Sequence, residues 1–407
     1  MATELYGIEA RIVDSIGSIG VSTNTNLYFI GTAPSGDLNT PITITSMGEA
    51  NTQLGLAPGD GHNLTDACIA AFQVAGLSQI TCIVISHSAD ASASDYLGDA
   101  TLGTGINAYE QALRDAPTAT NLVCIPRMTN GTVLAAMIAL CKNADGLKSY
   151  MIIDNDMAND HVNASGYPVS AEIVTDKTYS DTYASVVWGY IKTSANYIVS
   201  GAAVRACLMA KADVNKGVPY RVGGNLVVSG VSAIVCKHVE AGQNDDPDVI
   251  TWPAVKMTKA IANSLSADGI CSFRNRAATI VTWGDHTSAF SGGTISDELG
   301  RFENRARMNF MIANRWCIKY DAIIDDPLDL SMRDMIINEQ KDYLNGLVGI
   351  GALIGEQSVE FVAAENPIDN IVQGQFVWNI ATTATNPFKY GLAKVAFSSR
   401  GLSVYTV

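Results

Sequence analysis

The sequence predicts a multidomain protein of mixed α/β and α+β class, in which a mostly parallel central sheet carries flanking helices. Its 407 residues, at roughly 150 residues per domain, require more than one hydrophobic core. From about residue 105, continuous apolar strands alternate with amphipathic helices, a pattern typical of parallel sheets that are covered on both faces. From residue 291 this alternation gives way to two long helical patterns and a few short strands. We therefore predict five parts: an N-terminal arm (1–24), a small N-proximal domain (25–95), a central α/β domain (96–290), a C-terminal α+β domain (291–388) and a C-terminal arm (389–407).

The N-proximal domain is predicted to combine three buried strands and one helix. A turn with Pro34 and Gly36 separates the first two apolar runs, and Asn63 is a residue type that caps helices. We expect strands over 27–32, 40–45 and 80–85, and a helix over 63–76.

The central domain is predicted to continue the alternation. Its strands read as short continuous apolar runs, and the segments between them place apolar residues at helical spacing. We expect helices over 107–114, 132–143, 195–212 and 256–265, and strands over 122–125, 150–153, 186–190 and 278–284.

The C-terminal α+β domain is predicted to contain two long helices. Apolar residues recur at helical spacing after Ser296, and Ser331 with Asp334 has the spacing of a capping box. We expect the first helix to begin at Ser296, and the second to run from Ser331 to Asn345 and to end at Gly346. Strands over 359–363 and 376–380 follow.

Both ends of the chain carry a segment with strand-like alternation and no nearby hairpin partner. The first 24 residues have a net charge of −2, whereas the sequence after Asp369 has no acidic residue and three basic ones. A strand without a partner exposes backbone groups that a second chain can pair. The alternative is that each strand closes a sheet of its own domain. The candidate inter-subunit residues of these extended terminal β-strand arms are Ile8, Ala10 and Ile12 in the first, and Lys394, Val395, Phe397 and Arg400 in the second.

The composition argues against several functions. Lys and Arg total 26 against 40 Asp and Glu, a formal net charge of −14, which disfavours sequence-independent binding to nucleic acid. The apolar stretch 344–354 is about half of the roughly 20 residues that a membrane helix needs, and the N-terminus lacks the pattern of a secretory signal. The eight cysteines lie apart in apolar runs without a CxxC motif, as expected for buried thiols in a reducing compartment. We therefore expect a soluble protein that is made in the cytoplasm, with no nucleic-acid partner and no direct membrane insertion.

Motifs for catalysis or cofactor binding are weak. Gly349, Gly351 and Gly355 have a spacing like that of a dinucleotide fingerprint, but they lie between a predicted helix and a strand, which favours a connector. The sequence has neither a GxxxxGK[ST] phosphate loop nor a GxSxG nucleophile elbow, and its five histidines are isolated from one another. We assign no catalytic, cofactor-binding or metal residue, and keep as the alternative a cytoplasmic α/β enzyme that binds a nucleotide or sugar. Two acidic clusters are interpreted as solvated turns: Asp154, Asp156, Asp160 and His161, and the segment 321–329.

Four parts of the chain carry distinctive local motifs. They are the opening strand with its Pro and Gly turn (26–36 and 40–46), an apolar strand that ends in Trp-Gly-x-x-Thr (280–287), an Arg-containing helix start (301–305) and a Gly-Ala-Leu-x-Gly connector (347–355). These segments resemble contractile tail sheath proteins of phages and of related injection systems. In the second of them His286 stands where the family usually has an arginine. The resemblance covers both ends of the chain and is looser from about 95 to 270.

The resemblance implies a structural subunit and not an enzyme. In this family six subunits form a ring around a tail tube, the rings stack helically, and contraction drives the tube through a target cell envelope. Neighbouring subunits exchange terminal strands, which implies a role in that exchange for the seven arm residues named above. The implied partners are further copies of the chain, a tail tube protein, and baseplate and tail terminator proteins, with no cofactor. The implied location is the tail of a virion or an injection particle that is assembled in the bacterial host cytoplasm.

Overall fold

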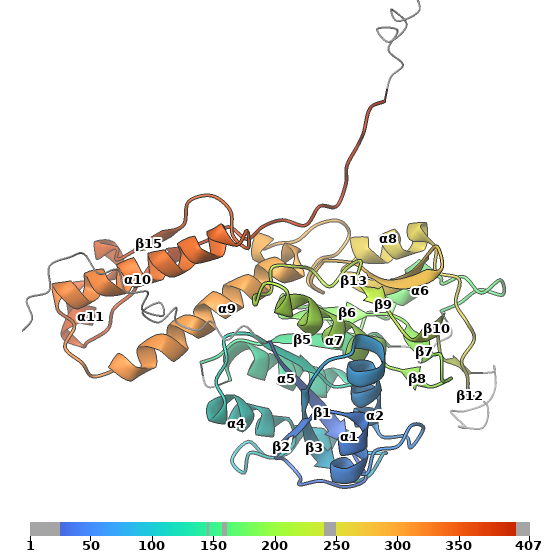
Figure 1. Ribbon diagram of the computed structural model, residues 1–407. Coiled ribbons are helices and arrows are strands. Elements are labelled where there is room, and N and C mark those ends of the chain that lie inside the picture. Colours follow the sequence, from blue (N-terminus) through green and yellow to red (C-terminus); the bar gives the residue numbers. More distant parts are fainter. Residues whose placement is uncertain (1–24, 145, 157–160, 240–249, 396–407) are drawn as a thin grey trace, which may run out of the picture.

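The computed structural model describes residues 25–144, 146–156, 161–239 and 250–395, and a nine-stranded sheet forms its centre (Figure 1). The strand order is β2-β3-β1-β4-β5-β6-β13-β14-β9. The five pairings between β3 and β13 are parallel, and those at the two ends of the sheet are antiparallel. The predicted mostly parallel sheet is thus confirmed. The strands are β1 (Asn26–Thr32), β2 (Pro41–Ile44), β3 (Ile80–Ser86), β4 (Asn121–Cys124), β5 (Tyr150–Asp154), β6 (Ala184–Val187), β9 (Val227–Val228), β13 (Ile270–Arg276) and β14 (Thr279–Trp283).

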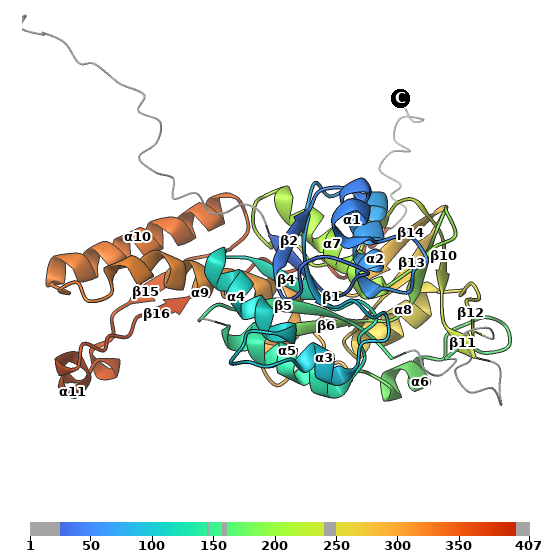
Figure 2. The same cartoon turned by 90° about the horizontal axis from the view of Figure 1, so that it is seen from below.

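Helices cover both faces of this sheet, as its continuous apolar strands require. Successive residues of one strand point into opposite cores, Phe29 into the first and Tyr28 into the second. The first core is covered by α1 (Met47–Leu54), α2 (Asn63–Cys68), the π-helix η1 (Ile69–Ala75) and α7 (Gly201–Val214). The second core is covered by α3 (Ala93–Leu97), η2 (Gly105–Asn107), α4 (Ala108–Asp115) and α5 (Gly131–Asn143). Figure 2 shows α2 and α7 on one side of the strands, and α3 and α5 on the other.

Smaller elements extend the body beyond β6. An antiparallel three-stranded sheet has the order β10-β7-β8, and a short hairpin-like pair joins β11 to β12. The elements are α6 (Ser170–Thr175), β7 (Tyr190–Thr193), β8 (Ile198–Val199), β10 (Val231–Val235), β11 (His238–Val239), β12 (Ile250–Thr251) and α8 (Lys259–Ala267).

The C-terminal unit projects from the body on two long helices, as Figures 1 and 2 both show. A third apolar core joins these helices through Met308, Met311, Leu344 and Leu347. The predicted pair of helices and the predicted pair of short strands are both present. The elements are η3 (Glu298–Arg301), α9 (Glu303–Tyr320), η4 (Asp321–Ile323), α10 (Leu330–Gly349), β15 (Ser358–Glu360), η5 (Ala363–Glu365), α11 (Ile368–Val372) and β16 (Asn379–Ala381).

In the central part, three predicted boundaries were wrong for local reasons. The helix predicted over 256–265 begins at Lys259, because the hydroxyl of Thr258 accepts a hydrogen bond from the Ile261 backbone at 3.2 Å and caps it there. The helix predicted over 195–212 begins at Gly201, because the hydroxyl of Ser200 accepts a hydrogen bond from the Ala203 backbone at 3.0 Å and caps it there. The strand predicted over 186–190 is interrupted at Gly189, whose φ of +100° does not fit a strand, so that β6 ends before it and β7 begins after it.

In the C-terminal unit, both long helices begin elsewhere than predicted. The first begins at Glu303 and not at Ser296, because the short 3-10 helix η3 comes first. The second is capped by Asp329 and not by Ser331, since the Asp329 carboxylate accepts a hydrogen bond from the Met332 backbone at 2.7 Å. It also passes Gly346 without ending there.

The sheet bears on the predicted division of the chain. Because β1 lies between β3 and β4, one sheet takes strands from both 25–95 and 96–290. The sheet therefore continues across the predicted boundary at residue 95. The predicted C-terminal unit, 291–388, in contrast contributes to a separate core around α9 and α10. Within the described residues, no helix combines the length and the apolar character needed to cross a membrane.

Candidate functional site

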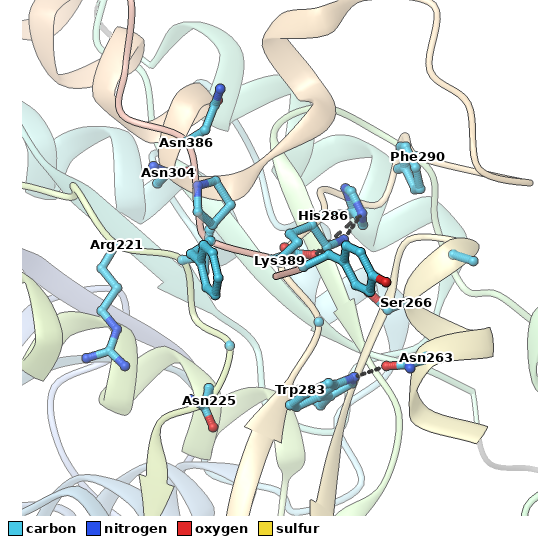
Figure 3. Close-up of a pocket in the computed structure, with 18 of the residues that line it drawn as sticks. Arg221, Asn225, Asn263, Ser266, Trp283, His286, Phe290, Asn304, Asn386 and Lys389 are labelled. Atoms are coloured by element: carbon cyan, nitrogen blue, oxygen red, sulfur yellow. Dashed lines mark hydrogen bonds and ion pairs between the residues drawn. The ribbon is translucent and has the colours of Figure 1, made fainter. Parts of the chain in front are cut away.

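Three segments that are distant in sequence meet where the chain leaves the body toward its C-terminal arm (Figure 3). They are the loop 284–290 after β14, the start of α9 and the segment 385–390. Together with the segment 220–225, Trp283 and the α8 residues Asn263 and Ser266, they line a cavity of about 840 Å³. The contacts around this cavity determine where the C-terminal arm begins.

His286 is the centre of these contacts. Its ring stacks on Phe290 with centroids 3.7 Å apart, and on Phe302 with centroids 5.2 Å apart. Its Nδ1 lies 2.5 Å from the carbonyl oxygen of Arg301, and because a carbonyl can only accept, Nδ1 carries a proton. Its Nε2 lies 2.6 Å from Nζ of Lys389 and accepts a hydrogen bond from it (Figure 3). The imidazole is therefore neutral, with its proton on Nδ1.

Lys389 is held by two adjacent residues of the loop. Its Nζ lies 2.9 Å from Oδ1 of Asp285, in addition to its contact with His286. Burial lowers the pKa of His286, Asp285 and the hydrogen bond to Arg301 raise it, and the Lys389 ammonium lowers it. The first side chain of the predicted C-terminal arm is thus fixed to the loop that follows β14.

A buried ion pair fixes the first turn of α9 beneath this loop. Arg205 of α7 donates to both carboxylate oxygens of Glu303, at 2.7 and 2.8 Å, and neither side chain has exposed surface. The same guanidinium donates to the backbone carbonyls of Gly223 and Gly284, at 3.1 and 3.0 Å. The hydroxyl of Ser185 also donates to Glu303. The helix is therefore joined to the body by a charge pair whose hydrogen bonds are satisfied, and not by apolar packing alone.

Side chains at the start of α9 also hold the segment that leads into the arm. Asn304 Nδ2 donates to the carbonyl oxygen of Thr385 at 2.7 Å. Arg305 donates to the side-chain oxygen of Asn386 at 2.9 Å. The C-terminal arm consequently starts from a point that is fixed to this helix by two further hydrogen bonds.

The chain just after the N-terminal arm is attached to the same helix. Arg307 of α9 forms an ion pair with Asp213 of α7, and both side chains are 1 % exposed. Asp213 accepts a hydrogen bond from the hydroxyl of Thr25 at 2.6 Å. Burial raises the pKa of Asp213, and Arg307 and Thr25 oppose that rise. The bases of both arms are therefore connected to the first two turns of α9.

Of the seven predicted arm residues, the structure describes Lys394 and Val395. They lie in the segment 391–395, which forms no strand with the described part of this chain and leads away from the body (Figure 1). Val395 is 94 % exposed. The other five lie outside the described residues: Ile8, Ala10, Ile12, Phe397 and Arg400.

The residue before the C-terminal arm and the first part of the arm expose large apolar side chains at alternate positions. Phe388 is 89 % exposed, Tyr390 80 % and Leu392 67 %. Exposed apolar side chains that recur along one segment are typical of a surface that another chain covers.

The crevice at the carboxyl ends of β1 and β4, where doubly wound proteins bind ligands, is filled by the protein itself. The side-chain oxygen of Asn63 accepts a hydrogen bond from the Thr32 backbone at 2.7 Å. Its Nδ2 donates to the hydroxyl of Tyr96 at 2.8 Å and to the carbonyl of Pro126 at 3.0 Å. A Cβ on Gly31 would lie 2.0 Å from that same Asn63 oxygen, so glycine is required there. This crevice therefore does not support the alternative that the protein is an enzyme that binds a nucleotide or a sugar.

The first acidic cluster is not the solvated turn that the sequence suggested, because Asp154 and His161 are buried, and its members make separate contacts. His161 pairs with Asp176 at 2.8 Å, and Asp160 lies outside the described residues. Burial raises the pKa of Asp154, and its hydrogen bonds oppose that rise. Those bonds come from Ser200 Oγ, Arg127 N and Ala202 N, at 2.6, 2.7 and 2.9 Å. In the part of the chain that the structure describes, no three His, Cys, Asp or Glu side chains are grouped so as to hold a metal ion.

Sequence reasoning did not identify the buried charge pairs. Arg205 and Asp213 both lie in a helix whose other residues are mostly Ala, Val, Leu and Met. A charged residue in such an apolar helix signals a buried partner, since an unpaired buried charge is strongly destabilising. The sequence does not indicate that these partners are Glu303 and Arg307.

Comparison with known proteins gives one relative by sequence and several by structure. No protein-family model matches the chain. A tail sheath protein of Burkholderia phage BcepMu is 24 % identical over 185 residues, which are 45 % of this chain and 35 % of that relative. The PVC sheath complex of an extracellular contractile injection system, in its contracted state, contains a chain with a TM-score of 0.67 and 14 % identity; the match covers 98 % of this chain and 100 % of that one. The six-fold symmetrised baseplate of the anti-feeding prophage contains a chain with a TM-score of 0.64 and 16 % identity, with coverage of 98 % and 99 %.

The protein therefore has the fold that chains of contractile sheath and baseplate assemblies adopt, over nearly its whole length. This is the fold that the resemblance in the sequence implies, and the relative found by sequence, a tail sheath protein, is similar to 45 % of the chain.

Proposed function

We propose that this chain is the structural subunit of a contractile tail sheath. It polymerises as stacked six-subunit rings around a tail tube, and contraction of the sheath drives that tube through a target cell envelope. The observation that carries the proposal is the likeness to the contracted PVC sheath, which covers 98 % of this chain. Such coverage includes the α/β body and the unit around α9 and α10, so the likeness is not limited to a common type of sheet.

The subunits are linked, in this proposal, by exchange of their terminal arms. The exposed side chains of Phe388, Tyr390 and Leu392 support it, as does the lack of any strand at 391–395 within the described chain. A strand added to a neighbour's sheet gains about 1 kcal/mol per net backbone hydrogen bond, so several such bonds hold two subunits together. The opposite charges of the two arms favour correct register between them. The residues proposed to pair are Ile8, Ala10 and Ile12, and Lys394, Val395, Phe397 and Arg400.

The attachment points of the two arm bases suit this role. Lys389 is ion-paired with Asp285 in the loop after β14, and Thr25 is hydrogen-bonded to the buried Asp213 of α7, so an arm that is held by a neighbour remains fixed to a rigid part of its own subunit. The body is then free to dock differently against its neighbours while the connections persist.

The proposed partners are further copies of the chain, a tail tube protein, and baseplate and tail terminator proteins. The proposed location is the tail of a virion or of an injection particle, after assembly in the bacterial cytoplasm. The division into 1–24, 25–95, 96–290, 291–388 and 389–407 is proposed as a division along the chain; because 25–95 and 96–290 contribute strands to one sheet, these two move as one body. This function requires no catalytic residue, cofactor or metal.

Negative-stain electron microscopy of the purified full-length protein tests the proposal. We expect tubes or stacks of rings, with six-fold symmetry in end-on views. The competing enzyme predicts a monomer or small oligomer whose melting temperature rises when a nucleotide or sugar is added. A protein that forms no rings or tubes and responds to such a ligand would overturn the proposed function.

A further inference from the structure

We propose that the contact between His286 and Lys389 is a pH-sensitive latch on the base of the C-terminal arm, closed when the imidazole is neutral and open when it is protonated. The inference rests on the proposed function, because the latch affects assembly only if residues 389–407 pair with a neighbouring subunit. The inference concerns the regulation of that arm: at acidic pH, the base of the arm at Lys389 is released from the loop after β14.

The two hydrogen bonds of the His286 ring are compatible with one protonation state of the ring, with a proton on Nδ1 and none on Nε2. Nδ1 must donate to the Arg301 carbonyl, 2.5 Å away, and Nε2 must then accept from the Lys389 ammonium, 2.6 Å away. A second proton on the ring would occupy Nε2 and remove the only acceptor that His286 offers to Lys389. It would also set two positive charges within hydrogen-bond distance of each other. The contact seen in the structure is therefore incompatible with a protonated His286.

The surrounding charges do not compensate for such a proton. Glu303 is already paired with Arg205, and Glu298 is paired with both Arg301 and Arg305. Asp285 is the carboxylate that lies close to both groups, 2.9 Å from Nζ of Lys389 and 3.5 Å from Nε2 of His286. The charged groups that face the ring or its two stacking partners are Asp285 on its own loop, Arg301 on η3, Glu303 and Arg305 on α9, Lys177 ahead of β6, and Lys389.

The Asp285 carboxylate is then close to two cations, the Lys389 ammonium and the protonated His286 ring. When His286 is protonated, its imidazolium competes with Lys389 for Asp285. The ring is held in place by Phe290 and Phe302, whereas Lys389 is at the end of a long side chain that is 42 % exposed. The lysine is the group that moves, and residue 389 and the arm beyond it lose their attachment to the loop.

The direction of the pH dependence follows from the pKa of His286, which is lowered in the closed state, first by burial. In the open state the ring stays between its stacking partners, but the Lys389 ammonium, which also lowers this pKa, has moved away, so the pKa of His286 is higher in the open state than in the closed one. The closed state thus binds the proton less well than the open state, so acidification favours opening. The effect is absent when the pH is well above the pKa of the open state, and it grows as the pH falls from that pKa toward the lower pKa of the closed state. Each unit of difference between the two pKa values shifts the equilibrium between closed and open tenfold.

Distance measurements on the unassembled full-length protein test the latch. One spin label is placed on Cys317, which is exposed on α9, and the other on Tyr390→Cys beside Lys389; the other described cysteines are buried. Double electron–electron resonance then gives the distance distribution at pH 8 and pH 5. We expect a single narrow distribution at pH 8 and a displaced, broader one at pH 5.

Three variants identify the group that is responsible. His286→Gln keeps an acceptor but does not titrate, so its distribution should be the same at both pH values. Lys389→Gln keeps a donor without its charge, so its response to acid should be strongly reduced. His87→Gln is the matched control, since His87 is an exposed histidine that contacts the Gly36 carbonyl; its response should equal that of the parent.

The outcomes separate the latch from the function on which it rests. Identical distributions at pH 8 and pH 5 in the parent, or a shift that persists in both His286→Gln and Lys389→Gln, would overturn the latch. The second variant keeps the test decisive if His286→Gln fails to fold. If a variant whose arm cannot pair as a strand, such as Val395→Pro, still forms normal tubes, the proposed role of the arm in assembly is wrong. That result is independent of the distance measurements.

Discussion

Replacing Arg205 by methionine is expected to destabilise the junction between the body and α9 by about 3–5 kcal/mol. The change removes three hydrogen bonds to Glu303 and those to the carbonyls of Gly223 and Gly284. It leaves a carboxylate with no exposed surface and no counter-charge. Ser185 and the Gly223 backbone still donate to that carboxylate, which keeps the loss within this range. The loss exceeds the net contribution of the intact pair, because the remaining charge has neither water nor a partner.

Urea unfolding of the unassembled protein, followed by tryptophan fluorescence, measures this loss. The double variant Arg205→Met with Glu303→Gln should recover much of it, because glutamine is neutral and retains an acceptor for Ser185. Arg114→Met is the control: Arg114 forms an exposed pair with Glu110, and its loss should cost no more than about 1 kcal/mol. The reasoning fails if Arg205→Met costs less than about 1 kcal/mol, or if the double variant is less stable than the single one.

Three further predictions concern the arm, the third core and an exposed ion pair. Val395→Pro should abolish tubes in electron micrographs without lowering the melting temperature, because proline removes a backbone donor from a paired strand, whereas Val395→Thr should assemble; normal tubes from the proline variant would contradict the arm exchange. Leu344→Ala, at a fully buried position, should cost about 2–5 kcal/mol in urea unfolding. Ile368→Ala, at a position that is 75 % exposed, should change stability by no more than about 0.5 kcal/mol, and equal losses would refute the assignment of this core. The hydrogen bond from Arg301 lowers the pKa of Glu298 to about 2, so the carboxyl resonance of Glu298 should titrate near pH 2. The stabilisation from this contact is present at neutral pH and should be lost as the pH falls through the pKa of the folded state. Arg301→Gln should raise the midpoint, and an unchanged midpoint would show that Arg301 is not the cause.

The centre of the sheet was predictable because strands buried on both faces read as continuous apolar runs. The expected strands at 27–32, 80–85, 122–125 and 150–153 lie within a residue or so of β1, β3, β4 and β5. The strand β13 was missed because its apolar first half continues into Arg274 and Arg276, which interrupts the pattern. Strand order was not accessible either, since nothing in the local sequence shows that β1 lies between β3 and β4.

The site was predictable only in part. The family resemblance drew attention to His286, but its partner Lys389 is 103 positions away, and no periodic pattern connects the two. Periodicity also shows that a helix is present without showing which polar side chain caps it, so Ser200 and Asp329 became visible only in three dimensions. The paired charges of α7 and α9 depend in the same way on how two distant helices meet.

The attachment of both arm bases to α9 has a mechanical consequence. Asn304, which binds the segment before the C-terminal arm, and Arg307, which holds Asp213 and through it Thr25, are three residues apart, or about 5 Å along the helix axis. In a sheath linked by its arms, part of the tension that enters a subunit through one arm passes to the other within about one helical turn of α9. The edge of the α/β body shares this load, because Thr25 is bound to Asp213 of α7 and leads directly into β1, and Lys389 is bound to the loop after β14. Insertions or deletions in loops of the body that lie away from these contacts would therefore alter the outer surface of the particle, while the spacing of the tethers from ring to ring stays the same.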